Sequence, residues 1–178
     1  MRTAVCNVFV LVMLMSLTTN SHAKKKNHHA HSHGVGTLGL VLEDSVLSVE
    51  LSIPAHDLVG FENKPQNESQ KAKIKEAREK LAAESNVIVI PKSAGCVLKE
   101  HELSGPVFNA DTKPKTDPHS DVHASWEFHC ADSSKLVDLG VELFVHFKSI
   151  HKLSVTTVNS KKQGSYQLTS KNKVIPTL

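Results

Sequence analysis

Apolar and polar residues alternate along two neighbouring stretches in the first third of the chain. Residues 35–43 place Leu38, Leu40 and Leu42 on one side, and residues 46–53 repeat the pattern with valine, leucine and isoleucine. A period of two is typical of a strand with one buried face. The pattern therefore predicts a β-hairpin that starts near Val35, turns at residues 43–45 and ends at Pro54.

Between residues 67 and 84 the apolar period changes to that of a helix. Ile74, Ala77 and Leu81 fall on one helical stripe, and Asn67 with Gln70 matches the spacing of a capping box. One amphipathic helix is predicted here.

The rest of the chain is divided into short apolar and β-branched segments by prolines, glycines and polar clusters. These segments predict strands at 87–90, 96–103, 122–130, 136–143, 153–158 and 166–169, and the proline-containing residues 105–121 predict a loop. The expected fold class is α+β: a mainly antiparallel β-sheet domain of about eight strands, with one principal amphipathic helix and one disulfide.

The N-terminal segment has the pattern of a cleavable signal peptide. Arg2 precedes an apolar run over residues 4–17, and Ser21-His22-Ala23 provides a small-x-small cleavage site. We therefore expect residues 1–23 to direct export, residues 24–33 to form a flexible histidine-rich tract, and residues 34–178 to form a single domain. No later apolar run is long enough to span a membrane, so stable membrane insertion is not expected.

Composition and motifs narrow the possible functions. The 178 residues carry a formal charge of +3 and only 4% aromatic residues, so neither a basic nucleic-acid footprint nor a base-stacking surface is indicated. The chain contains no H-E-x-x-H, G-x-S-x-G or glycine-rich phosphate-loop motif. No catalytic residues are predicted, and we do not expect an enzyme.

Cleavage at residue 23 would leave two of the three cysteines, Cys96 and Cys130. An even pair in an exported protein favours a disulfide between them, because the compartment is oxidising. The alternative is that both thiolates bind metal.

Histidine is the most unusual feature of the composition, with twelve residues in the chain. Four of them lie within six residues of the tract, at His28, His29, His31 and His33. Side chains two apart in an extended chain project to the same side, and neutral imidazoles are common zinc ligands. The tract therefore predicts a Zn²⁺ site.

A further ligand could come from the loop, where His119 and His123 have the i,i+4 spacing of a metal-binding pair. The remaining histidines are interpreted differently. His129 is a possible ligand, whereas structural or surface roles are expected for His56, His101, His146 and His151.

Several local strings of residues, taken together, resemble those of the Zrg-type periplasmic zinc-binding family. The members of this family are small exported proteins of Gram-negative bacteria. The matching strings are His29-Ala30-His31-Ser32-His33-Gly34, Pro54-Ala55, Leu58-Val59-Gly60-Phe61-Glu62, Ala94-Gly95-Cys96, Phe128 with Cys130-Ala131-Asp132, and Phe144 with Phe147. The resemblance implies a periplasmic protein that binds zinc and assists its uptake. It also implies that the two cysteines are the pair bonded in such proteins.

The sequence thus predicts a periplasmic protein that captures Zn²⁺ through histidines and delivers it to, or buffers it for, an inner-membrane uptake system. Two alternatives remain: a copper- or nickel-binding protein, and a secreted structural or interaction domain with incidental histidines. A metallohydrolase is a third. Residues 24–178 contain no methionine, which excludes a thioether Cu(I) site.

Overall fold

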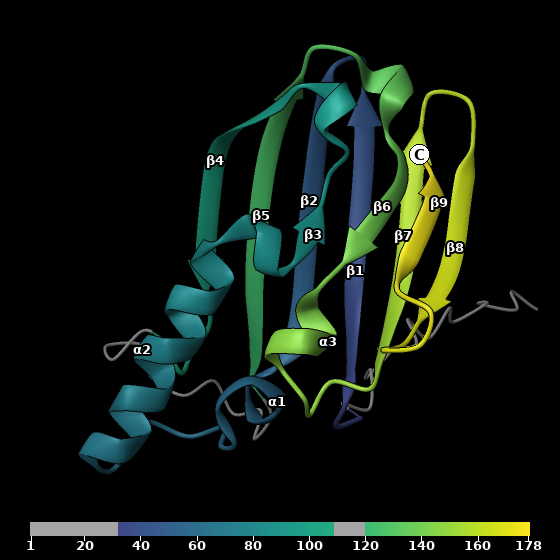
Figure 1. Ribbon diagram of the computed structural model, residues 1–178. Coiled ribbons are helices and arrows are strands. Elements are labelled where there is room, and N and C mark those ends of the chain that lie inside the picture. Colours follow the sequence, from purple (N-terminus) through teal and green to yellow (C-terminus); the bar gives the residue numbers. More distant parts are fainter. Residues whose placement is uncertain (1–31, 109–119) are drawn as a thin grey trace, which may run out of the picture.

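The computed structural model describes residues 32–108 and 120–178. Its largest element is a six-stranded sheet in the order β4-β5-β2-β1-β7-β8 (Figure 1). The strands of this sheet are β1 (Val35–Glu43), β2 (Val46–Pro54), β4 (Cys96–Ser104), β5 (Asp121–Cys130), β7 (Lys152–Asn159) and β8 (Gln163–Leu168). A smaller sheet, in the order β3-β6-β9, contains β3 (Ile88–Val89), β6 (Val137–Val141) and β9 (Val174–Thr177).

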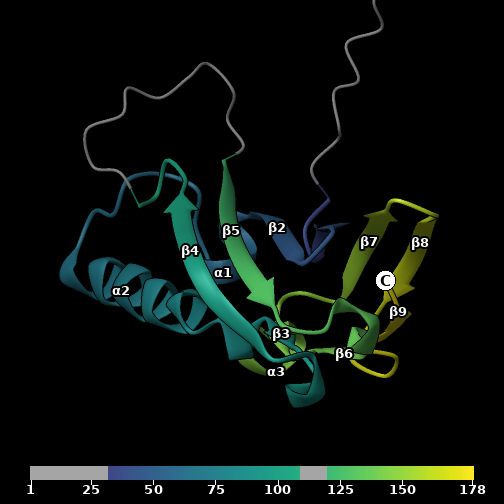
Figure 2. The same cartoon turned by 90° about the horizontal axis from the view of Figure 1, so that it is seen from above.

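One face of the large sheet is covered and the other is open. The covering elements are the helices α1 (Ala55–Val59), α2 (Glu68–Ala82) and α3 (Leu143–His146) together with the small sheet (Figures 1 and 2). Three 3₁₀ turns, at Glu84–Asn86, Lys92–Ala94 and Ser133–Lys135, connect these elements. Within residues 32–108 and 120–178, no helix combines the length and apolar character needed to cross a membrane.

The predicted N-terminal hairpin is confirmed. β1 and β2 are antiparallel, and Glu43 pairs with Val46 across a two-residue turn. β1 also pairs with β7, and this pairing is parallel, with Val35 opposite Lys152. Every other strand pair in the described residues is antiparallel, which confirms the mainly antiparallel α+β class.

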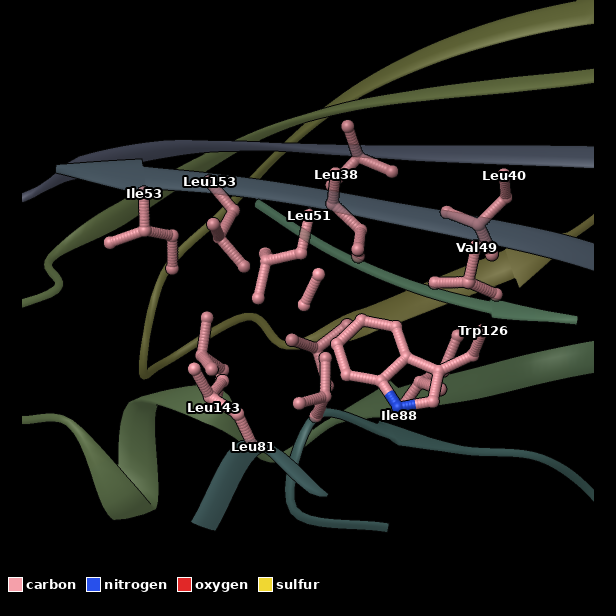
Figure 3. Close-up of a cluster of buried hydrophobic side chains, with 14 of the residues drawn as sticks. Leu38, Leu40, Val49, Leu51, Ile53, Leu81, Ile88, Trp126, Leu143 and Leu153 are labelled. Atoms are coloured by element: carbon pink, nitrogen blue, oxygen red, sulfur yellow. The ribbon is translucent and has the colours of Figure 1, made fainter. Parts of the chain in front are cut away.

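The hydrophobic core lies between the large sheet and its covering elements. Alternate residues of the strands point inward, as their period of two requires. Figure 3 shows these strand residues facing side chains from α2, β3 and α3; the labelled members are Leu38, Leu40, Val49, Leu51, Ile53, Trp126 and Leu153 from the sheet, and Leu81, Ile88 and Leu143 from the opposite layer. The alternation in the sequence therefore determines which sheet face is buried.

Helix α2 begins close to its predicted position, with Asn67 as its N-cap. The Asn67 side chain accepts a hydrogen bond of 2.9 Å from the Gln70 amide. The return bond of a capping box is shifted by one residue, because Gln70 Oε1 accepts from the Gln66 amide at 2.7 Å. The Gln70 amide, one of those that the first helical turn leaves unpaired, thus has a partner, and so has the Gln66 amide just before the N-cap.

We expect Asn67→Ala to lower the free energy of unfolding by about 1 kcal/mol, because the Gln70 amide loses its acceptor. Urea unfolding followed by circular dichroism measures this change. Ser69→Ala is the matched control, since Ser69 is exposed in the same turn and its side chain makes no hydrogen bond within the described residues. Equal stability losses in the two variants would contradict a capping role for Asn67.

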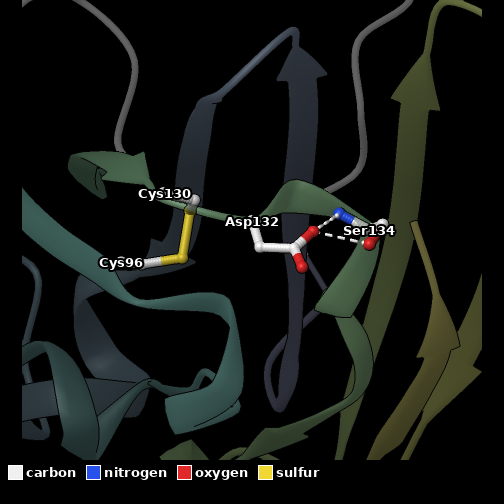
Figure 4. The surroundings of a disulfide bond; sticks show 4 residues. All are labelled: Cys96, Cys130, Asp132 and Ser134. Atoms are coloured by element: carbon white, nitrogen blue, oxygen red, sulfur yellow. Dashed lines mark hydrogen bonds between the residues drawn. A yellow bond between two sulfur atoms is a disulfide. The ribbon is translucent and has the colours of Figure 1, made fainter.

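The structure contains a disulfide between Cys96 and Cys130, as predicted (Figure 4). It joins β4 to β5 at residues that are direct cross-strand partners, with their Cα atoms 3.8 Å apart. Just beyond it, Asp132 caps the turn at Ser133–Lys135. Asp132 accepts bonds from the Ser134 hydroxyl at 2.5 Å and the Ser134 amide at 3.1 Å, and these bonds hold the pKa of its carboxyl below the usual value.

Some short elements differ from the prediction. The strand expected at 136–143 ends at Val141, and α3 follows it. Helix α1 and strand β9 were not predicted at all. Each has five residues or fewer, which is too short to show a hydrophobic period. Of these, α1 matters most, because it carries part of the site described next.

Candidate metal centre

Helix α1 holds a buried carboxylate, Asp57, at the end of β2. The helix follows Pro54 directly, and the amide of Ala55 donates a 2.8 Å hydrogen bond to the Ser120 carbonyl. At the other end Gly60 has a φ of +85°, which ends the helix, and its amide donates to the His56 carbonyl at 2.8 Å. Both ends of α1 are therefore fixed, and Asp57 points inward with only 2% of its side chain exposed.

A turn at the start of β1 places His33 opposite α1. The Val35 amide bonds to the Ser32 carbonyl at 3.1 Å, and Gly34, the third residue of the turn, has a φ of +79°. This is the geometry of a type II turn, which favours glycine at that position. A Cβ atom on Gly34 would also lie 2.8 Å from Cδ2 of His151.

Gly34 connects the turn to both neighbouring segments. Its carbonyl accepts hydrogen bonds from the amides of His151 and Lys152, at 2.8 and 3.0 Å. Its own amide donates to Oδ2 of Asp57 at 2.6 Å, a buried bond between residues 23 positions apart. The backbone next to His33 is thus held by β7 on one side and by α1 on the other.

His33, His56 and Asp57 form a cluster that we call the triad. The Nδ1 atoms of His33 and His56 lie 3.9 and 3.7 Å from Oδ1 of Asp57. The two imidazole rings are 4.5 Å apart between centroids and inclined at 54°. Within the described part of the chain, this is the one group of three or more His, Cys, Asp or Glu residues whose ligand atoms lie within 4.8 Å of one another.

The triad has the chemistry of a zinc site with an open position. Bond lengths of about 2.0 Å in a tetrahedral site place neighbouring ligand atoms about 3.3 Å apart. The distances of 3.7 and 3.9 Å therefore need to shorten by only a few tenths of an ångström. Two imidazoles and one carboxylate supply three of four tetrahedral ligands, which leaves one position for water or another donor.

The surroundings of Asp57 favour a cation. Its Oδ2 is oriented by the Gly34 amide, in the way that outer hydrogen bonds orient metal-binding carboxylates. Within the described residues it pairs with no lysine or arginine, and the ring nitrogens of the two histidines lie within 4 Å of its Oδ1. A buried carboxylate without a cationic partner is costly, and a divalent ion at Oδ1 would offset that cost.

The structure places the candidate ligands from the sequence in three groups. His33 belongs to the triad. His123 lies on the open face of the large sheet, exposed and opposite Ser52 and Ser104, and is not part of the triad. The other four candidates lie outside the described residues: His28, His29, His31 and His119.

His56 and Asp57 were not predicted as ligands. His56 was expected to have a structural or surface role, and Asp57 was not singled out. Their only sequence signal is that they are adjacent and follow the Pro54-Ala55 string. The contact with His33 depends on how β1, β2 and α1 pack together.

Comparison with known families identifies the chain. A family model described as the ZrgA family zinc uptake protein matches residues 30–177. The chain belongs to this family. ZrgA membership confirms the resemblance seen in the sequence, and the matched region contains the whole triad and both disulfide cysteines. The ZrgA description names zinc uptake and no catalysed reaction. A search of curated proteins finds no significant match to this chain.

Proposed function

We propose that this ZrgA family protein captures Zn²⁺ in the periplasm and delivers it to, or buffers it for, an inner-membrane uptake system. The observation that carries the proposal is the triad, a zinc-type ligand set in a chain of a zinc uptake family. The disulfide supports an exported location, because such bonds persist in oxidising compartments. The protein acts by binding and release and catalyses no covalent step.

His33, His56 and Asp57 are the proposed inner ligands, and the histidine-rich tract is the proposed source of the fourth. His31 lies two residues before His33, so in an extended chain both side chains project to the same side. His28 and His29 are further proposed ligands of this tract. His119 and His123 remain a proposed pair of their own, because His123 does not lie in the triad.

The exposure of the triad suits uptake and release. The side chains of His33 and His56 are 53% and 49% exposed, whereas Asp57 is buried. An ion bound here keeps contact with solvent, so ligands from a receiving protein can approach it. A structural zinc site, by contrast, is closed by four protein ligands.

Calorimetric titration of the mature protein with Zn²⁺ tests the proposed ligands. We expect His33→Ala and His56→Ala each to weaken the tightest zinc-binding phase by at least the roughly 10- to 100-fold that loss of an outer hydrogen-bond partner costs, because each removes one of three direct ligands. His129→Ala is the matched control: its side chain is 50% exposed and bonds to Glu127 at 3.1 Å, away from the triad.

Two results would contradict this assignment. If His56→Ala binds zinc like the wild type while replacement of His28, His29 and His31 removes the tight phase, the tract binds zinc without the triad. If copper or nickel binds more tightly and co-purifies with the protein from unsupplemented cells, the cargo is not zinc.

A further inference from the structure

A cavity of about 290 Å³ lies beside the triad, and His56 and Asp57 form part of its wall. The rest of the wall comes from α2 and from the segment of residues 146–149 that includes the end of α3. Figure 1 shows α1, α2 and α3 gathered at the same end of the large sheet. The cavity is just below the range of roughly 300–1,000 Å³ typical of ligand pockets, so it suits a small molecule.

The wall of this cavity is rich in positive charge. Lys73 and Lys80 line it from α2, and Lys148 lines it from the segment after α3. Lys80 pairs with Glu76 at 2.7 Å, and this contact lowers the pKa of Glu76, which keeps its carboxylate ionised. Within the described residues, Lys73 and Lys148 make no ion pair or hydrogen bond. Two lysine charges therefore face the cavity without a carboxylate partner.

A zinc ion on the triad would add to the positive charge of the cavity wall. The three lysines and the two carboxylates of Glu76 and Asp57 leave the wall with a net charge of +1 when its histidines are neutral. A Zn²⁺ ion on the triad would raise the local charge to +3. An anion in the cavity would therefore be attracted both by the bound zinc and by the lysine charges of the wall.

Lys73 lies near the C-terminal end of α1, beyond the two triad residues of that helix. Its Nζ atom lies 4.0 Å from the place a Cβ on Gly60 would occupy, whereas His56 and Asp57 lie one turn earlier in α1. A ligand with two anionic groups could therefore contact the triad through one group and Lys73 through the other.

We infer that the triad binds zinc together with a small polycarboxylate. One carboxylate oxygen of this molecule takes the open position on the zinc, and another carboxylate lies between Lys73 and Lys148. The inference rests on the proposed zinc function and names the form in which the cargo is held. In this inference the cavity holds the anion. While the anion is bound it retains zinc on the triad, and when the anion leaves, the zinc becomes accessible for transfer.

The probe for this inference is tricarballylate, a small tricarboxylate. Zinc affinity is measured with a competing fluorescent indicator while a metal buffer fixes the free zinc concentration, so that zinc bound by the probe in solution does not alter the result. In the wild type we expect the probe to tighten zinc binding roughly tenfold, a typical size for coupling between two ligands. Acetate, which has one carboxylate, should produce much less tightening.

Two double variants locate the effect. Lys73→Met with Lys148→Met should lose the tightening by tricarballylate. Lys71→Met with Lys75→Met also removes two positive charges, but from positions on α2 that do not line the cavity. This control variant should retain the tightening by tricarballylate. Zinc affinity without the probe is measured for every variant, so that an effect on zinc alone is separated from an effect on coupling.

The outcomes separate the two proposals. If the wild type binds zinc but tricarballylate does not tighten it, or if both double variants lose the tightening equally, the polycarboxylate inference is wrong and the zinc function stands. If His56→Ala has no effect on zinc affinity, the triad is not the zinc site and the inference fails with the ligand assignment. If the wild type binds no zinc, the proposed function itself fails.

Discussion

Asp57→Asn is expected to weaken zinc binding by at least about 100-fold. Loss of an outer hydrogen-bond partner alone costs roughly 10- to 100-fold, and this change removes the charge of a proposed direct ligand. Oδ1 of Asp57 faces both histidines of the triad, at 3.7 and 3.9 Å. If the amide oxygen keeps the Gly34 hydrogen bond, the amide NH2 group takes the place of Oδ1 and leaves Zn²⁺ with two imidazoles and no anionic ligand.

The asparagine variant is chosen because it keeps the local fold. Its amide oxygen can still accept the Gly34 amide bond that Asp57 accepts at 2.6 Å. The metal-free variant should therefore unfold at the same urea concentration as the wild type. Zinc at 100 times its dissociation constant should stabilise only the wild type, by about 2.7 kcal/mol. Equal zinc stabilisation of both proteins would contradict a ligand role for Asp57.

Removal of the disulfide is expected to have the largest effect on stability. The double change Cys96→Ala and Cys130→Ala opens a crosslink between residues 34 positions apart. The chain-entropy relation gives a loss of about 4 kcal/mol for a loop of that length. Urea unfolding of the variant and of the oxidised wild type measures the difference. A loss below about 1 kcal/mol would show that the crosslink restrains little of the unfolded chain.

The same variant should bind zinc normally while it is folded. Cys130 lies at the hairpin end of β2, where its amide bonds to the Ser45 carbonyl at 2.8 Å, whereas α1 follows the opposite end of that strand. Nine strand residues place these ends about 26 Å apart. A zinc affinity that falls in this variant would indicate that the crosslink shapes the triad from a distance, because the oxidised wild type has no free thiolate at Cys96 or Cys130.

Much of the fold could be predicted from residue patterns because the patterns are local. A period of two over residues 35–53 is sufficient to define a hairpin with one buried face, and Leu38 and Leu40 are indeed fully buried. The helix signal over residues 67–84 and its Asn67 cap likewise depend on neighbours within one or two turns. The parallel pairing of β1 with β7 has no such signal, because the partners are more than 100 residues apart.

The candidate site, too, was partly predictable from the sequence. Histidine clustering indicated metal binding and included His33, and the sequence strings indicated the zinc uptake family that the family model confirms. The triad itself depends on tertiary packing. His56 and Asp57 lie in a five-residue helix without a recognisable period, 23 or more positions from His33.

The sequence by itself therefore determined most of the strands, the main helix, the cysteine pair and the family, because each depends on residue order within a short window or along the whole chain. Tertiary structure decided which histidines meet a carboxylate. Gly34 links β1, β7 and α1 through three hydrogen bonds, and this junction brings His33 beside Asp57. A site built across such a junction is specified by packing, which no local pattern encodes.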